Sequence, residues 1–127
     1  MIKLTFCLRR REGLSLEEFQ RYWRERHAPL VAERAETLGV RRYVQCHTAD
    51  LDGVHRALRA RNDGAPEPFD GVAELWFDDL GAFLADADDV REAAAALLAD
   101  EREFIDLARS PMWLSEEHEV VGPAATA

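Results

Sequence analysis

The stretch from Ile2 to Gly39 reads IKLTFCLRRREGLSLEEFQRYWRERHAPLVAERAETLG, and it predicts one strand followed by one long helix. Apolar side chains alternate with other residues over positions 2–9, which is the pattern of a strand. Ser15 with Glu18 three residues later forms a capping box, which favours a helix start at this point. Apolar residues then recur at three- and four-residue spacing as far as Gly39, a common helix stop. We therefore expect a helix over 16–38.

The following segments repeat the alternation of strands and helices. VRRYVQCHT (40–48) and FDGVAELWF (69–77) show two-residue periodicity with β-branched and aromatic residues, so each predicts a strand. The connection over 49–69 is polar and contains glycine and proline, so its structure is left unassigned, with a short helix near 54–60 as one option.

The last third of the chain predicts a second helical region and a final strand. Helix formers dominate from 79 to 109, the acidic run DADD can divide them, and Pro111 ends them. MWLSEEHEVV (112–121) predicts the fourth strand. The order β-α-β-β-α-β is typical of an α+β ferredoxin-like sandwich, in which helices cover one face of a four-stranded antiparallel sheet. We expect one domain over 1–122 and a C-terminal tail over 123–127.

Composition narrows the class of partner. The chain has 127 residues and a formal net charge of -9, which disfavours nucleic acid and anionic membranes as partners. No apolar run has the length of a membrane span, and the N-terminus lacks the features of a signal peptide, so a cytoplasmic protein is expected. Cys7 and Cys46 lie in predicted strands without a CxxC motif, which indicates reduced, buried thiols.

The predicted strands offer one apolar and one mixed face. The apolar set comprises Leu4, Phe6, Leu8, Val44, Cys46, Ala73, Leu75 and Phe77, and the mixed set comprises Thr5, Cys7, Tyr43, Gln45, His47, Glu74 and Trp76. Two helices cannot cover both faces, so we expect a homodimer joined sheet to sheet. We expect the helices to cover the mixed face, with a pocket inside each subunit; the opposite assignment is the alternative.

His27 lies on the buried side of the first predicted helix, four residues after Trp23. Pro29 has no N–H and clashes with the carbonyl of Glu25, so the helix must bend or loosen beside this histidine. Two interpretations fit. His27 is either a core residue that stabilises the bend or an acid–base group whose pKa suits proton transfer near neutral pH.

The remaining candidates come from the strands. Glu74 sits between apolar neighbours, so it is either paired with an arginine such as Arg42 or it is a general base with a raised pKa. His47 shares a side with Tyr43 and Gln45, which together can hydrogen-bond a carbonyl or phenol ligand. The alternative for His47 is a solvated strand end. Each tryptophan is either core or the wall of a ligand pocket, and the three are Trp23, Trp76 and Trp113.

No metal or nucleophile motif is present. The four histidines at 27, 47, 55 and 118 form no HxH or HxxxH pair, and no Gly-x-Ser-x-Gly elbow exists. We expect no metal and no cofactor.

The chain resembles the EthD family of dimeric α/β-barrel proteins from about Lys3 to Val121. The most specific part is Phe-x-x-Tyr-Trp-x-x-x-His-x-Pro on the first helix, with Phe19, Tyr22, Trp23, His27 and Pro29 all present. Tyr43 with His47, and Asp70-Gly71 with Trp76, add to the likeness. The resemblance implies a ferredoxin-like subunit, a barrel-forming dimer and a pocket for a small organic ligand. Family members are associated with ether catabolism alongside an oxygenase, and with decarboxylation or dehydration of aromatic polyketides.

Three functions follow from these observations. The first is a cofactor-free lyase or isomerase in which His27 and either His47 or Glu74 move protons on an aromatic or polyketide-like substrate. Oxidoreductase chemistry is the runner-up within this class. The second is a non-catalytic accessory protein that holds a hydrophobic metabolite for an oxygenase. The third is a haem-binding enzyme with His27 or His47 as axial ligand. The expected substrate-binding residues are Trp23, Tyr43, Gln45, Trp76 and Trp113.

Overall fold

The computed structural model describes residues 1–123, so most of the expected tail over 123–127 lies outside the described residues. The order of elements is the expected one, with a few short additions. The strands are β1 (Ile2–Leu8), β2 (Arg42–His47), β3 (Gly71–Phe77) and β4 (Met112–Ser115). The helices are α1 (Leu16–Tyr22), α2 (Ala28–Leu38), α3 (Asp52–Arg61), α4 (Leu80–Phe83) and α5 (Asp88–Phe104). A π-helical turn, η1 (Trp23–His27), joins α1 to α2, and a 3-10 turn, η2 (Leu107–Arg109), precedes β4.

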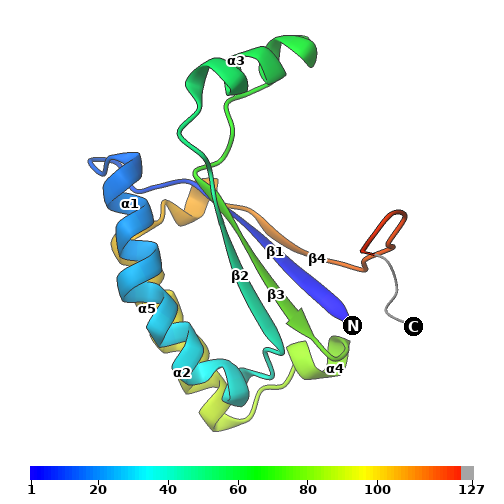
Figure 1. Cartoon of the computed structure of the whole chain (residues 1–127). Helices are drawn as coiled ribbons and strands as arrows, with labels where there is room; N and C mark the ends of the chain where they lie inside the picture. Colours follow the sequence, from blue (N-terminus) through cyan, green and yellow to red (C-terminus); the bar gives the residue numbers. More distant parts are fainter. Residues whose placement is uncertain (124–127) are drawn as a thin grey trace.

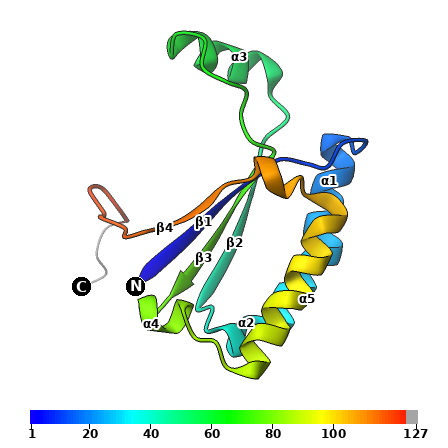
Figure 2. The same cartoon turned by 180° about the vertical axis from the view of Figure 1, so that it is seen from behind.

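The four strands form one antiparallel sheet in the order β2-β3-β1-β4. The helical layer of α1, α2 and α5 lies on one face of this sheet, and no helix of the described chain covers the other face (Figures 1 and 2). The expected α+β ferredoxin-like arrangement is confirmed. We call the side toward these helices the inner face and the opposite side the outer face.

The first helical region begins and passes Pro29 as the sequence predicted. The Ser15 hydroxyl accepts from the Glu18 N–H at 3.0 Å, and the Glu18 carboxylate accepts from the Ser15 N–H at 3.1 Å. Because Pro29 has no N–H to donate, the chain widens into the π turn, where the Ala28 N–H donates to the Trp23 carbonyl. The helix then continues to Leu38 without a break (Figure 1).

The second helical region and the last strand are shorter than predicted. The acidic run does separate α4 from α5, but α5 ends at Phe104 and not near Arg109. Ile105 adopts an extended conformation and forms a β-bridge with Arg10, so a tertiary contact, and not Pro111, ends the helix. The predicted strand over 112–121 forms only as far as Ser115. The connection over 49–69, which the sequence left unassigned, contains the helix α3, and this helix projects away from the sheet (Figure 1).

The register of β2 corrects the predicted sheet faces. Tyr43 pairs with Leu75, and Val44 pairs with Glu74. Since cross-strand partners point to the same side, Tyr43, Gln45 and His47 share the inner face with the apolar residues of β1 and β3. The helices therefore cover the apolar residues of β1 and β3, whereas Val44 and Cys46 of the predicted apolar set lie on the outer face. The expectation that the helices cover Glu74 and Trp76 is wrong. Cys46 points to the outer face and is exposed, so only Cys7 is the buried thiol that was expected.

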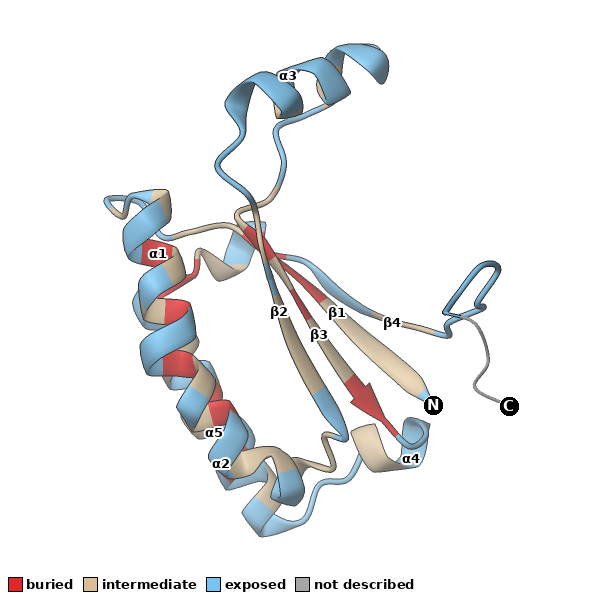
Figure 3. Cartoon of the chain, in the orientation of Figure 1, coloured by how far each residue is buried: buried red, intermediate tan, exposed pale blue. Residues whose placement is uncertain are grey.

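The core lies between the helical layer and the inner face (Figure 3). Its largest fully buried side chains are Leu8, Phe19, Trp23 and Phe104. Trp23 packs directly on Gly71, where an added Cβ would come within 2.3 Å of the indole ring. Glycine at this position therefore allows the π turn to approach the sheet. Among the helices described, none combines the length and apolar character that a membrane-spanning segment needs.

Candidate functional site

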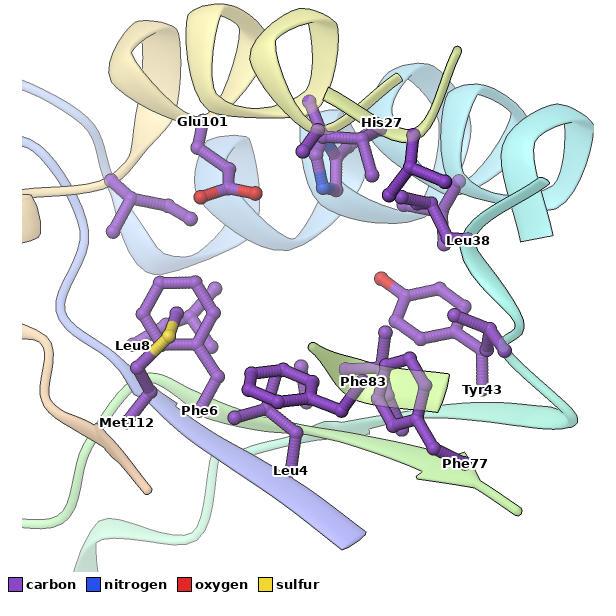
Figure 4. Close-up of a pocket in the computed structure, with 18 of the residues that line it drawn as sticks. Leu4, Phe6, Leu8, His27, Leu38, Tyr43, Phe77, Phe83, Glu101 and Met112 are labelled. Carbon is purple, nitrogen blue, oxygen red and sulfur yellow. The ribbon is translucent and has the colours of Figure 1, made fainter. Parts of the chain in front are cut away.

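A cavity of about 350 Å³ lies between the helical layer and the inner face of the sheet (Figure 4). Most of its lining is aliphatic or aromatic, including Leu4, Phe6, Leu75, Val31 and Leu97. Four residues with polar side-chain groups interrupt this lining within the described chain, apart from the indole of Trp23: His27, Tyr43, Arg91 and Glu101. A mostly apolar cavity with a few polar groups is the usual form of a small-molecule site.

His27 ends the π turn and is 5% exposed. Its Nδ1 lies 2.7 Å from Asp100 Oδ2 on α5, and the other oxygen of Asp100 accepts from the Tyr22 hydroxyl at 2.7 Å. An ionised carboxylate only accepts hydrogen bonds, so Nδ1 carries the proton and Nε2 carries the lone pair. A ring nitrogen of His27 points into the cavity (Figure 4). Because Nδ1 is held by Asp100, this nitrogen is Nε2, and the arrangement places a basic nitrogen on the cavity wall.

Burial controls the charge of these groups. It lowers the pKa of His27 below the ordinary value of 6.5, although the hydrogen bond and charge of Asp100 act in the opposite direction. Burial and the hydrogen bond to Asp100 raise the pKa of Tyr22 to about 12. His27 is therefore neutral near pH 7 and can accept a proton.

Glu101 follows Asp100 on α5 and points its carboxyl group into the cavity beside His27 (Figure 4). Burial and, to a smaller extent, the negative charge of Asp100 raise the pKa of Glu101 to about 7. The cavity thus holds a neutral imidazole and a carboxyl group that is partly protonated at neutral pH. Such a pair can remove one proton and supply another.

A hydrogen-bonded row runs along the inner face of β2. The Gln45 amide nitrogen donates to the Tyr43 hydroxyl at 2.8 Å and to the Trp23 carbonyl at 3.0 Å. The Gln45 amide oxygen lies 2.8 Å from His47 Nε2, and the His47 ring packs against Trp23 with centroids 4.4 Å apart and the ring planes inclined by 33°. His47 itself does not line the cavity, and only Tyr43 of this row does. The structure thus brings together the predicted residues His27, Trp23, Tyr43, Gln45 and His47.

Three predicted site residues lie elsewhere. Glu74 and Trp113 belong to the outer face, and so does Trp76. Glu74 pairs with Lys3 at 2.7 Å, and this bond lowers the pKa of Glu74. The alternative that Glu74 is ion-paired is therefore confirmed, with Lys3 in place of Arg42, and the alternative of a raised pKa is wrong. Trp76 lies against Lys3 and Arg42, and its indole N–H donates to Glu117. Trp113 is half exposed.

Sequence reasoning missed Asp100 and Glu101. Both fall between Leu97 and Phe104 on the apolar stripe of α5, so two adjacent carboxylates at this point of a buried face were a detectable signal. Across residues 1–123, no three His, Cys, Asp or Glu side chains gather where they could hold a metal ion.

The comparison with known protein families gives a match over more than half of the chain. The model of the EthD domain matches residues 11–108, which include the π turn, β2, β3 and α5. The chain belongs to the EthD family. The resemblance inferred from the Phe-x-x-Tyr-Trp-x-x-x-His-x-Pro motif is confirmed. Among proteins of curated function, none matches this EthD protein.

Solved structures share the fold of this EthD protein at low sequence identity. An EthD family protein from Bacillus halodurans is 17% identical with a TM-score of 0.60, and the match covers 93% of this chain and 99% of that one. An EthD-like protein from Ralstonia eutropha is 21% identical with a TM-score of 0.59, covering 97% and 95%. HapK from Hahella chejuensis is 15% identical with a TM-score of 0.59, covering 98% and 99%.

Proposed function

We propose that this EthD protein is a cofactor-free enzyme that moves protons on an aromatic or polyketide-like substrate. The observation that carries the proposal is His27, held through Nδ1 by Asp100, with its free Nε2 facing an apolar cavity that also contains Glu101. Decarboxylation, dehydration and isomerisation next to a carbonyl all need an acid and a base on either side of the reacting atoms. Glu101 replaces Glu74 as the carboxyl group of this pair, because Glu74 lies on the other side of the sheet.

The roles follow from the charge states. Neutral His27 takes a proton from the carbon next to a carbonyl, which forms an enolate and a protonated imidazole beside Asp100. Protonated Glu101 can deliver a proton to the enolate that forms. The lining is mostly aliphatic, and such an apolar surrounding strengthens both interactions.

Proton exchange tests this proposal without knowledge of the natural substrate. The probe is 2-tetralone, a bicyclic ketone whose C1 hydrogens are replaced by deuterium through the enolate. We expect the protein to accelerate this exchange in D₂O, as measured by ¹H NMR, and to accelerate loss of CO₂ from benzoylacetic acid. No acceleration of either reaction above buffer would contradict the proposal.

The exchange rate is expected to have a maximum against pH. Below the lowered pKa of His27 the imidazole is protonated and cannot act as a base, so the rate rises as pH increases through that value. Above about pH 7 Glu101 loses its proton and can no longer act as an acid, so the rate falls. Other groups near this pair also act on it. The charge of Asp100 acts on the pKa of both His27 and Glu101, and the charge of Arg102 lowers the pKa of Glu101. Tyr43 and Arg91 also border the cavity. Glu101→Gln is expected to be slower and to lack the fall at high pH.

A non-catalytic role in holding a ligand is the second candidate, and the apolar character of the cavity lining favours it. In that case the protein binds an aromatic ketone but leaves its exchange rate unchanged. The exchange assay, run beside a binding measurement on the same ketone, therefore separates the two functions.

We also propose that the protein is a homodimer joined through the outer face. This face carries Val44, Cys46, Val72 and Trp113 and has no helical cover in the described chain. A neighbour from Bacteroides fragilis, with a TM-score of 0.56 at 12% identity, is described as a dimeric protein with a ferredoxin-like fold, and this supports the proposal. Light scattering is expected to give twice the chain mass of 14.4 kDa. A single species of one chain mass at micromolar concentration would contradict it.

A further inference from the structure

Two contacts of the Gln45 side chain determine which end of its amide group is the nitrogen and which is the oxygen. One end of the amide lies 3.0 Å from the Trp23 carbonyl oxygen, which can only accept a hydrogen bond. That end must therefore be the nitrogen, because an amide oxygen there would face another oxygen without a hydrogen between them. The amide oxygen then faces His47 Nε2 at 2.8 Å, so His47 must carry its proton on Nε2. Nδ1 then has no proton to donate, which agrees with its position: it is buried and has no hydrogen-bond partner among the described residues.

The same amide nitrogen determines the direction of the Tyr43 hydroxyl. Its second hydrogen goes to the Tyr43 oxygen at 2.8 Å, and an amide nitrogen cannot accept a hydrogen bond in return. The hydroxyl hydrogen of Tyr43 therefore needs another acceptor, and no side chain or carbonyl within residues 1–123 accepts it. The Tyr43 oxygen points into the cavity, on the sheet side opposite His27 (Figure 4). The unused hydrogen is thus available to whatever fills the cavity.

We infer that Tyr43 is the hydrogen-bond donor that binds a carbonyl or enolate oxygen of the ligand, and that Gln45 and His47 are positioning residues that hold its hydrogen toward the cavity. The inference deepens the proposed function and rests on this cavity being the ligand site. It gives the ligand class as a flat, apolar ketone or β-keto compound, whose oxygen lies at Tyr43 on the sheet and whose adjacent carbon faces His27 on the helical layer. Gln45 links the sheet wall of the cavity to the helical wall, because its amide nitrogen also donates to the Trp23 carbonyl, in the π turn that ends in His27.

The first test reads the tautomer of His47 in the unmodified protein. We expect ¹⁵N NMR at neutral pH to show His47 protonated on Nε2 and unprotonated on Nδ1, with the signals assigned by their loss in His47→Gln. Burial and the positive charge of Arg24 lower the pKa of His47, so the neutral ring is the form present. A proton on Nδ1 would overturn the inference, and this readout does not depend on the stability of any variant.

The second test uses 6-acetyl-2-dimethylaminonaphthalene, an aryl methyl ketone whose emission moves to longer wavelength when its carbonyl accepts a hydrogen bond. We expect the bound probe to emit at longer wavelength in the wild type than in Tyr43→Phe, and to bind Tyr43→Phe about 3- to 10-fold more weakly, the size of one neutral hydrogen bond. Gln45→Glu should give the emission of Tyr43→Phe although the hydroxyl is retained, because its carboxylate accepts the hydrogen that Tyr43 would otherwise donate. His55→Gln on the projecting α3 is the control and should behave as wild type.

The outcomes separate this inference from the proposed function. Equal emission from wild type and Tyr43→Phe would overturn the role of Tyr43, and wild-type emission from Gln45→Glu would overturn the role of Gln45. Failure of the probe to bind the wild type would overturn the ligand class. If the emission and tautomer results hold but 2-tetralone exchange is not accelerated, the catalytic proposal fails and the ketone-binding site stands.

Discussion

Replacing His27 with alanine is expected to slow 2-tetralone exchange by about 10²–10⁴-fold, because the variant lacks the general base. The fold should survive, since the π turn is held by the Ala28 N–H bond to Trp23 and by Gln45. Removing the imidazole leaves Asp100 without one of its partners, and this costs roughly 1–3 kcal/mol in the free energy of unfolding. A variant that is destabilised yet exchanges 2-tetralone at the wild-type rate would show that His27 is structural only.

Asp100→Asn tests whether activity needs the lone pair on Nε2 of His27 or only a histidine at this position. An asparagine amide can donate to Nδ1, which would move the ring proton to Nε2 and remove the lone pair from the cavity. We therefore expect Asp100→Asn to lose exchange activity although His27 remains. His55→Ala, on α3 and outside the cavity, is the matched control and should keep the wild-type rate.

Replacing Phe104 with alanine is expected to cost about 3–5 kcal/mol in the free energy of unfolding, because it leaves a cavity in the core. Phe104 is 0% exposed, and its ring centroid lies 4.9 Å from that of Tyr22, 5.1 Å from that of His27 and 5.6 Å from that of Phe19. Phe104 is the last residue of α5, one turn after Asp100 and Glu101, and its ring packs this end of α5 against the first helix. The measurement is urea unfolding at one fixed protein concentration, since association would add to the apparent stability.

Leu98→Ala on the same helix is the control for this substitution. Leu98 is 41% exposed, so its truncation removes far less buried surface and should change the free energy of unfolding much less than that of Phe104. If the two variants unfold at similar urea concentrations, the ring contacts of Phe104 with Phe19, Tyr22 and His27 do not hold α5 against the first helix.

Local signals in the sequence were enough to predict most of the fold. The capping box at Ser15, the stop at Gly39 and the two-residue periodicity of the strands each depend on neighbouring residues, and each was found where expected. The loosening of the helix at Pro29 was predictable for the same reason, because a missing N–H acts on its own helix turn. The end of α5 was not predictable in this way, since Ile105 leaves the helix to pair with Arg10, which lies 95 positions earlier in the chain.

The site was predicted only in part. His27, Trp23 and Tyr43 border the cavity as expected, whereas Glu74 and Trp76 lie behind the sheet and Glu101 was missed. Alternation within β2 shows which of its residues share a side, but the pairing of Tyr43 with Leu75 decides which side that is.

The sequence by itself determined the order of elements, the EthD membership and the buried position of His27, because these depend on short-range periodicity, capping and one local motif. Only the tertiary structure decided which groups meet His27. Asp100 and Glu101 lie more than seventy positions further along the chain, and the packing of α5 on the first helix brings one of them to Nδ1 and the other into the cavity. The register in which β2 pairs with β3 likewise brings Tyr43 to the inner face. A side chain's charge state and bonding partners depend on such long-range packing, which no local pattern encodes.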